Sequence, residues 1–121
     1  MTLEDLWMQR ICQGQVVNVL NLYTPNAVLV ATFAPAPLTT RTQLKNYFVE
    51  FIGGKPGLCG KILSKESRQI SKNSYVSSGL YEFYWNDNGK TATQKARYTY
   101  VWVVDQYDNW KILTHHSSVV P

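Results

Sequence analysis

The chain has 121 residues, the length of one domain, which leaves no room for a second catalytic unit. Hydrophobic residues make up 45% and charged residues 17%, and this balance excludes a disordered chain. The net charge is +4, but no basic stretch is interleaved with aromatic residues and no apolar run approaches about 18 residues. We therefore expect neither a nucleic-acid partner nor a membrane span.

The first 25 residues have a helical pattern. Apolar residues recur at helical spacing over 3–23, and Thr2 with Asp5 has the spacing of a capping box. A polar interruption at 13–15 leaves two interpretations open, one long helix or two short ones. Pro25 ends the pattern, because proline disfavours a helical conformation in the residue before it.

A buried strand and a second helix follow. The short apolar run 27–33 predicts the strand, and a loop with two prolines comes after it. Thr40 and Gln43 again have capping-box spacing, and Gly53–Gly54 supplies a helix stop. Between them, four apolar residues lie on one helical face: Leu44, Tyr47, Phe48 and Phe51.

The second half of the chain predicts strands. Alternating or apolar residues predict three strands, at 75–85, 96–104 and 110–119, and a weaker pattern predicts a fourth at 61–71. Turns at 86–89 and 105–109 separate the last three strands. Early helices and late strands favour an α+β fold, a single domain over 1–121 with helices covering one face of an antiparallel sheet. If that sheet is strongly curved, a pocket forms at the wide end of the cone.

The two cysteines, Cys12 and Cys59, are isolated and form no CxxC pair. We expect no disulfide framework from them. The N-terminus has no basic segment followed by an apolar run. The prediction is a cytoplasmic protein in a reducing compartment.

Both histidines of the chain are adjacent, at His115 and His116, and Ser117 and Ser118 follow them. Neighbours on a regular strand point to opposite faces, so the histidines cannot chelate one metal ion together. His116 and Ser118 share the face of Ile112, which we expect to point into the cone, although a one-residue bulge would reverse this. From these residues alone, a buried hydrogen-bond network is favoured over a serine nucleophile.

The closing residues 115–121 resemble the HHSSxxP signature of iota-class carbonic anhydrases. That class is related to the association domain of calcium/calmodulin-dependent kinase II and to the nuclear transport factor 2-like, or SnoaL-like, superfamily. Four further segments resemble the same family in order along the chain: 22–29, 46–51, 96–102 and 110–112. The resemblance implies a cone-shaped α+β fold, with N-terminal helices packed on a strongly curved antiparallel sheet.

The resemblance also implies an activity, the reversible hydration of carbon dioxide to bicarbonate. By position, the hydroxyls that would hold water or bicarbonate are those of Thr32, Tyr47 and a closing serine, for which register favours Ser118. His116 is the expected base, because the ordinary pKa of histidine is near 6.5 and that of tyrosine near 10.

Three more residues are expected to contact the substrate: Arg97, Ser117 and His115. Arg97 would supply a cation for bicarbonate if its side chain faces the pocket. Some members of the class are described as metal-free and others as metal-dependent. Since the chain has no recognisable ligand spacing, we expect no metal ligands and no cofactor, with zinc or manganese as the alternative.

Two other functions remain open. One is a non-catalytic module for ligand binding or assembly, like the kinase association domain. The other is a polyketide-type isomerase or cyclase, disfavoured because the acidic residues lie mostly in turns and in the first helix. We also expect a homodimer formed through outward-facing aromatic residues of two strands: Tyr81, Phe83 and Trp85, and Tyr98, Tyr100 and Trp102.

Overall fold

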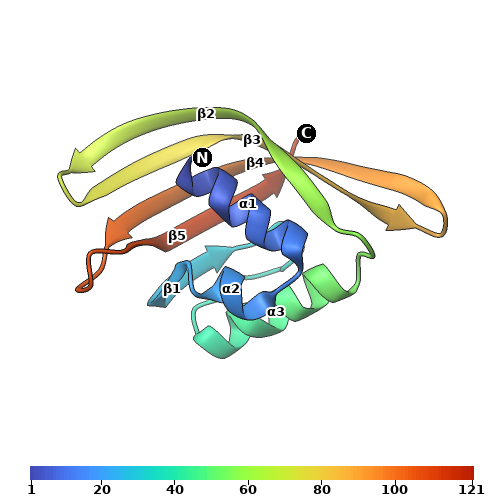
Figure 1. The fold of residues 1–121 in the computed structure, drawn as a ribbon, viewed down its shortest axis with the longest axis horizontal. Coiled ribbons are helices and arrows are strands. Elements are labelled where there is room, and N and C mark those ends of the chain that lie inside the picture. The colour runs from blue at the N-terminus through green and yellow to red at the C-terminus, as the bar shows by residue number, and fades with distance from the viewer.

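The computed structural model describes residues 1–121 as three helices and one five-stranded sheet. The elements are α1 (Leu3–Gln13), α2 (Val16–Leu20), β1 (Tyr23–Val30), α3 (Arg41–Gly53), β2 (Cys59–Ser71), β3 (Ser74–Asp87), β4 (Lys90–Val104) and β5 (Trp110–Val119). All three helices lie on one side of the long, curved strands β2 to β5 (Figure 1). The predicted α+β architecture is therefore correct.

The N-terminal helical pattern forms two helices and not one. Thr2 and Asp5 make both hydrogen bonds of a capping box at the start of α1. Gly14 ends α1 with a φ of 72°, in the left-handed region that glycine adopts most readily. None of the helices is long and apolar enough to cross a membrane.

The helix predicted from Thr40 onward is confirmed as α3. Thr40 and Gln43 form its capping box, as their spacing indicates. The face with Leu44, Phe48 and Phe51 is buried against the rest of the core. Tyr47 lies at the edge of this face and is only half-buried.

The sheet has the strand order β1–β5–β4–β3–β2. Strands β2 to β5 form the expected antiparallel meander, and β1 pairs with β5 in parallel at one edge. β1 begins at Tyr23, upstream of the predicted start at residue 27, and a register shift separates Tyr23 from Val28. The exposed Pro25 lies in that interval, and an edge strand tolerates proline because one side of it forms no ladder.

The aromatic faces of β3 and β4 point toward the helices, so the expectation that they face outward is wrong. Tyr81 and Phe83 on β3 are almost fully buried, and so are Tyr98, Tyr100 and Trp102 on β4. Trp85 is half-buried and packs against the same core. α1 covers this face, and the rings of Trp7 and Tyr81 are stacked with their centroids 5.8 Å apart. These rings are the core of the cone.

A bulge interrupts β5. Val101 pairs with Thr114, but the next residue, Trp102, pairs with Ile112, so Leu113 is an extra residue on β5. An extra residue shifts the alternation of the strand by one position. Ile112 is buried, yet the next buried residues are His115 and Ser117.

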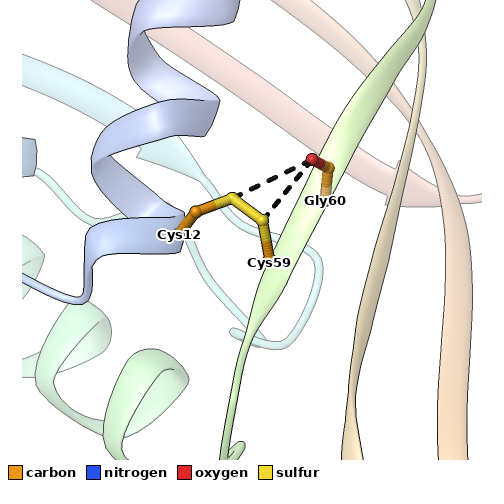
Figure 2. Close-up of a disulfide and its surroundings, with 3 residues drawn as sticks. All are labelled: Cys12, Cys59 and Gly60. Atoms are coloured by element: carbon orange, nitrogen blue, oxygen red, sulfur yellow. Dashed lines mark hydrogen bonds between the residues drawn. A yellow bond between two sulfur atoms is a disulfide. The ribbon is translucent and has the colours of Figure 1, made fainter.

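The two cysteines form a disulfide, so the expectation of isolated thiols is wrong. Cys12 and Cys59 join the end of α1 to the start of β2, with their Cα atoms 4.2 Å apart (Figure 2). Both sulfurs also lie near the carbonyl oxygen of Gly60, at 3.9 and 3.8 Å. The pairing could not be predicted from the sequence, because a separation of 47 residues between two cysteines is not diagnostic of a disulfide.

Candidate functional site

A small cavity lies between the helices and the inner face of the sheet. It has about 20 Å³ of space for the centre of a water molecule, so it is large enough to admit water. Most of its lining is apolar or aromatic. Its polar groups come from five elements or loops: Thr32, Tyr47, Tyr81, Gln94, His115 and Ser117.

Two of the hydroxyls are directly joined. The Oγ1 atom of Thr32 lies 2.5 Å from the Oγ atom of Ser117, and either hydroxyl can donate. Thr32 follows β1 and Ser117 lies on β5, so the parallel pairing of these strands brings the two together. The hydroxyls of Thr32 and Ser117, predicted from the resemblance, therefore share one site.

His115 lies deeper, in a buried chain of hydrogen bonds. The indole Nε1–H of Trp7 donates to the hydroxyl of Tyr23 over 3.0 Å. That hydroxyl lies 2.8 Å from His115 Nδ1, and the hydroxyl of Tyr81 lies 3.2 Å from His115 Nε2. Both ring nitrogens are thus occupied by tyrosine hydroxyls.

The number of hydrogen-bond donors on each group shows which atom donates in each of these hydrogen bonds. Tyr23 already accepts from Trp7, so its own proton is free for Nδ1 of His115. A neutral imidazole then carries its proton on Nε2 and donates it to Tyr81. Burial lowers the pKa of His115 to about 3, and the neighbouring His116 contributes in the same direction, so the ring is neutral near pH 7.

The tyrosines at the cavity are neutral hydroxyl donors. Burial raises the pKa of Tyr47 to about 12, against a smaller lowering by a hydrogen bond with the backbone of Phe33. Burial also raises the pKa of Tyr81, and a hydrogen bond with Ser117 offsets part of that rise. Because the phenols keep their protons, the site can donate hydrogen bonds to an oxygen atom but offers no phenolate base.

The structure places three predicted site residues away from the cavity. His116, Ser118 and Arg97 lie on the opposite face of the sheet, where Arg97 Nε donates to Ser118 Oγ over 3.2 Å. His116 and Arg97 are exposed. The preference for His116 and Ser118 is therefore wrong, because the bulge at Leu113 reverses the alternation after Ile112.

No carboxylate lines the cavity. The one fully buried acid, Glu4, accepts from Ser77 and Tyr75, and Lys65 lies 3.5 Å from its other oxygen. No group of three or more His, Cys, Asp or Glu residues is arranged to hold a metal ion. Both cysteines are in the disulfide, and both nitrogens of His115 are hydrogen-bonded, so these residues do not fit a protein-held metal.

An open vestibule of about 200 Å³ adjoins the cavity. It shares Phe33, Tyr47 and Phe51 with the cavity lining and adds two charged residues, Glu50 and Lys55. The cation near the site is thus Lys55, on the loop after α3, and not Arg97.

Sequence reasoning missed Trp7, Tyr23, Tyr81 and Lys55. Alternation on β3 did place Tyr81 on one face with Phe83, but only the covering helices show that this face points inward. Trp7 and Tyr23 are separated from His115 by most of the chain, so no local signal joins them.

The fold and this cavity define a cone-shaped protein in which helices close a curved sheet over an aromatic cavity that also holds several hydroxyl groups. The calcium/calmodulin-dependent protein kinase II association domain family matches residues 1–121, so the chain belongs to this family. A search of curated proteins found no match.

Solved structures agree with this assignment. A Xanthomonas campestris protein described with the same association domain is 34% identical, with a TM-score of 0.90 over 98% of this chain and 84% of its own. A nuclear transport factor 2-like protein from Salmonella enterica is 17% identical (TM-score 0.82; 98% and 86% covered). A ketosteroid isomerase-like protein from Erwinia carotovora is 13% identical (TM-score 0.80; 98% and 91% covered). The last two show that the fold is nuclear transport factor 2-like.

Proposed function

We propose that this protein is a carbonic anhydrase of the iota type, which interconverts carbon dioxide and bicarbonate in the cavity. The observation that carries the proposal is the hydrogen-bonded pair Thr32 and Ser117, which lines a narrow aromatic cavity together with Tyr47. The HHSSxxP ending supports it, since Ser117 belongs to that motif. The catalytic set that we propose is thus Thr32, Tyr47 and Ser117, with Tyr81 and His115 behind them.

The lining suits both partners of the reaction. Carbon dioxide is apolar and fits among aromatic rings, whereas bicarbonate needs hydrogen-bond donors. In hydration, the oxygen of a water molecule held by Thr32 and Ser117 bonds to the carbon of carbon dioxide. One C=O electron pair moves onto its oxygen, where hydroxyl donors such as that of Tyr47 stabilise the new charge. The proton released from water passes through the hydroxyls to solvent.

His115 acts in this scheme as a positioning residue. A pKa of about 3 makes it a poor proton acceptor near pH 7. Its Nε2–H instead donates to Tyr81, which leaves the Tyr81 hydroxyl proton free to point toward the cavity and Ser117. Since the residues present do not fit a protein-held metal, we propose a metal-free reaction and route no step through zinc or manganese.

A second candidate is an assembly module. The description of the matched family as an association domain favours it, and it is compatible with a pocket that binds a ligand without turnover. In both proposals we expect a homodimer. The isomerase or cyclase alternative is weaker, because no carboxylate lines the cavity.

A cytoplasmic location remains a prediction, and the disulfide is an argument against it. Disulfides are typical of oxidising compartments and rare in the cytosol. The pairing of Cys12 and Cys59 therefore favours an oxidising compartment over the reducing one expected from isolated thiols.

Stopped-flow hydration of carbon dioxide with a pH indicator tests the activity. The protein is first treated with a chelator and compared with Thr32→Ala and with Thr39→Ala, an exposed threonine that serves as control. We expect turnover that survives the chelator and falls at least about tenfold in Thr32→Ala only. Activity restored only by added metal would overturn the metal-free mechanism, and no rate above background would favour the assembly module.

A further inference from the structure

We propose that Lys55 makes the vestibule a binding site for small monovalent oxyanions. Bicarbonate is the oxyanion of this class that we expect to bind there. The choice of bicarbonate rests on the proposed function, because it would be the anion that leaves the cavity. The site itself rests on the position, environment and charge of Lys55.

The ammonium group of Lys55 lies above three aromatic rings. Its Nζ atom is 4.6 Å from the ring centroid of Phe33, 5.0 Å from that of Phe51 and 5.4 Å from that of Trp85. Each distance is within the range of a cation–π contact. Phe33 and Phe51 also line the inner cavity, so the rings place the charge at its mouth.

Backbone hydrogen bonds hold the loop that carries Lys55. The Lys55 carbonyl accepts from the Leu58 N–H over 3.0 Å, and the Pro56 carbonyl accepts from the Asn86 N–H over 2.8 Å. The second bond ties the loop to β3, the strand of Trp85. The ammonium is therefore positioned by both the loop and the rings.

No carboxylate forms a salt bridge with Lys55. The two salt bridges of the protein join Lys65 to Glu4 and Arg68 to Glu66. Partial burial lowers the pKa of Lys55, in keeping with an ammonium that has lost part of its water shell. Aromatic faces offer no hydrogen-bond acceptor comparable to a carboxylate oxygen, so the N–H donors of the ammonium remain free for an anion.

The vestibule lining suits a small oxyanion leaving the cavity. Tyr47 lines both spaces, so an oxyanion can pass from the inner hydroxyls to Lys55 without losing all its donors. Glu50 lines the same vestibule and opposes an anion. Carbon dioxide has no charge, so Lys55 should affect bicarbonate binding far more than carbon dioxide entry.

Titration of ¹⁵N-labelled protein with sodium bicarbonate at constant ionic strength, followed by NMR, tests the site without requiring turnover. We expect saturable shifts at the amides around Phe33, Tyr47 and Lys55. Lys55→Met should weaken binding about fivefold, as for a partly exposed charge contact of about 1 kcal/mol. Lys55→Arg should retain binding, because a guanidinium group keeps the positive charge and also packs on aromatic rings.

Two further variants keep the test independent of folding. Lys90→Met removes the same charge from the exposed first residue of β4 and should bind like the wild type. Glu50→Gln removes the opposing charge and should bind two- to threefold more tightly, by about half a kcal/mol. Formate, a monovalent oxyanion that is not a product, should bind at the same residues.

The outcomes separate this site from the proposed activity. Equal bicarbonate affinity in Lys55→Met and wild type, or shifts that never saturate, would overturn the anion site even if hydration is observed. Saturable binding lost in Lys55→Met would support the site even if no hydration is detected, in which case only the proposed activity fails.

Discussion

Ser117 and Ser118 are chemically identical neighbours on opposite faces of β5. Ser117 is buried beside Thr32, whereas Ser118 accepts a hydrogen bond from Arg97 on the outer face. Ideal alternation from the buried Ile112 selects Ser118. The extra residue Leu113 selects Ser117 instead, because a single insertion moves every later side chain to the other face.

This difference gives a matched pair of variants. Ser117→Ala removes the hydroxyl that meets Thr32 and should lower the hydration rate at least about tenfold. Ser118→Ala should leave the rate within about twofold, since it loses only an exposed contact with Arg97. The rates are compared by stopped flow, and an equal loss in both variants would contradict the register.

His115 makes stability depend on pH. Its pKa is about 3 in the folded protein and near 6.5 in an unfolded chain, so between these values the unfolded state binds more protons. The contribution is fully present above about pH 6.5 and is lost as the pH falls toward 3, with a slope of up to about 1.4 kcal/mol per pH unit. Urea unfolding at a series of pH values measures it.

The neighbouring histidine is the control for that experiment. His116→Gln should keep the slope because it leaves the buried ring of His115 in place, whereas His115→Gln should flatten it between pH 4 and 6. A slope that persists unchanged in His115→Gln would assign it to another group.

At the scale of elements, the disulfide joins α1 to the edge strand β2. α1 carries Trp7 and Met8 onto the sheet, and Met8 lies close to Gly60 beside the disulfide. A link that closes a loop of this length restricts the unfolded chain more than the folded one. The disulfide therefore holds the helix that completes the cavity.

Replacing both cysteines, Cys12→Ser with Cys59→Ser, should lower the free energy of unfolding by about 2 to 4 kcal/mol. Denaturant unfolding of the double variant and of the reduced and oxidised wild type measures this change. The cysteines do not line the cavity, so activity below the unfolding transition should remain. Identical midpoints for reduced and oxidised protein would contradict a stabilising disulfide.

At the scale of the whole molecule, the outer face of the sheet is the large surface that the helices leave uncovered. Its apolar residues are fewer than the sequence suggested, because the aromatic rows of β3 and β4 face inward. Leu80 and Tyr84 alternate with the buried residues of β3 and are a little over a third exposed. Since the matched family is named for association, we expect two copies to pair through this face.

Light scattering at micromolar concentration tests the pairing. The wild type should have twice the mass of the chain, and Leu80→Glu should shift it toward the monomer by placing a charge in the interface. Tyr107→Glu is the control, because Tyr107 is 74% exposed in the turn before β5. A monomeric wild type, or a dimer unaffected by Leu80→Glu, would contradict this interface.

Local patterns were sufficient for much of the fold. The capping boxes at Thr2 and Thr40, the glycine stop at Gly53–Gly54 and the alternation of β3 and β4 depend on neighbours within a few residues, and they recur in the structure. The parallel position of β1 beside β5 has no local signal, because it depends on which distant strand buries its face.

The site was predictable in composition but not in orientation. Thr32, Tyr47, His115 and Ser117 were all identified from the sequence and meet at the cavity. His116, Ser118 and Arg97 were identified with them, yet they lie on the outer face. The sequence by itself thus determined which elements form and which residue types gather at the closing strand, because helix caps and alternation are local. Only the tertiary structure decided which side chains of β5 face the cavity, that the two cysteines pair, and that Lys55 lies at the cavity mouth. Each of these depends on contacts between distant segments.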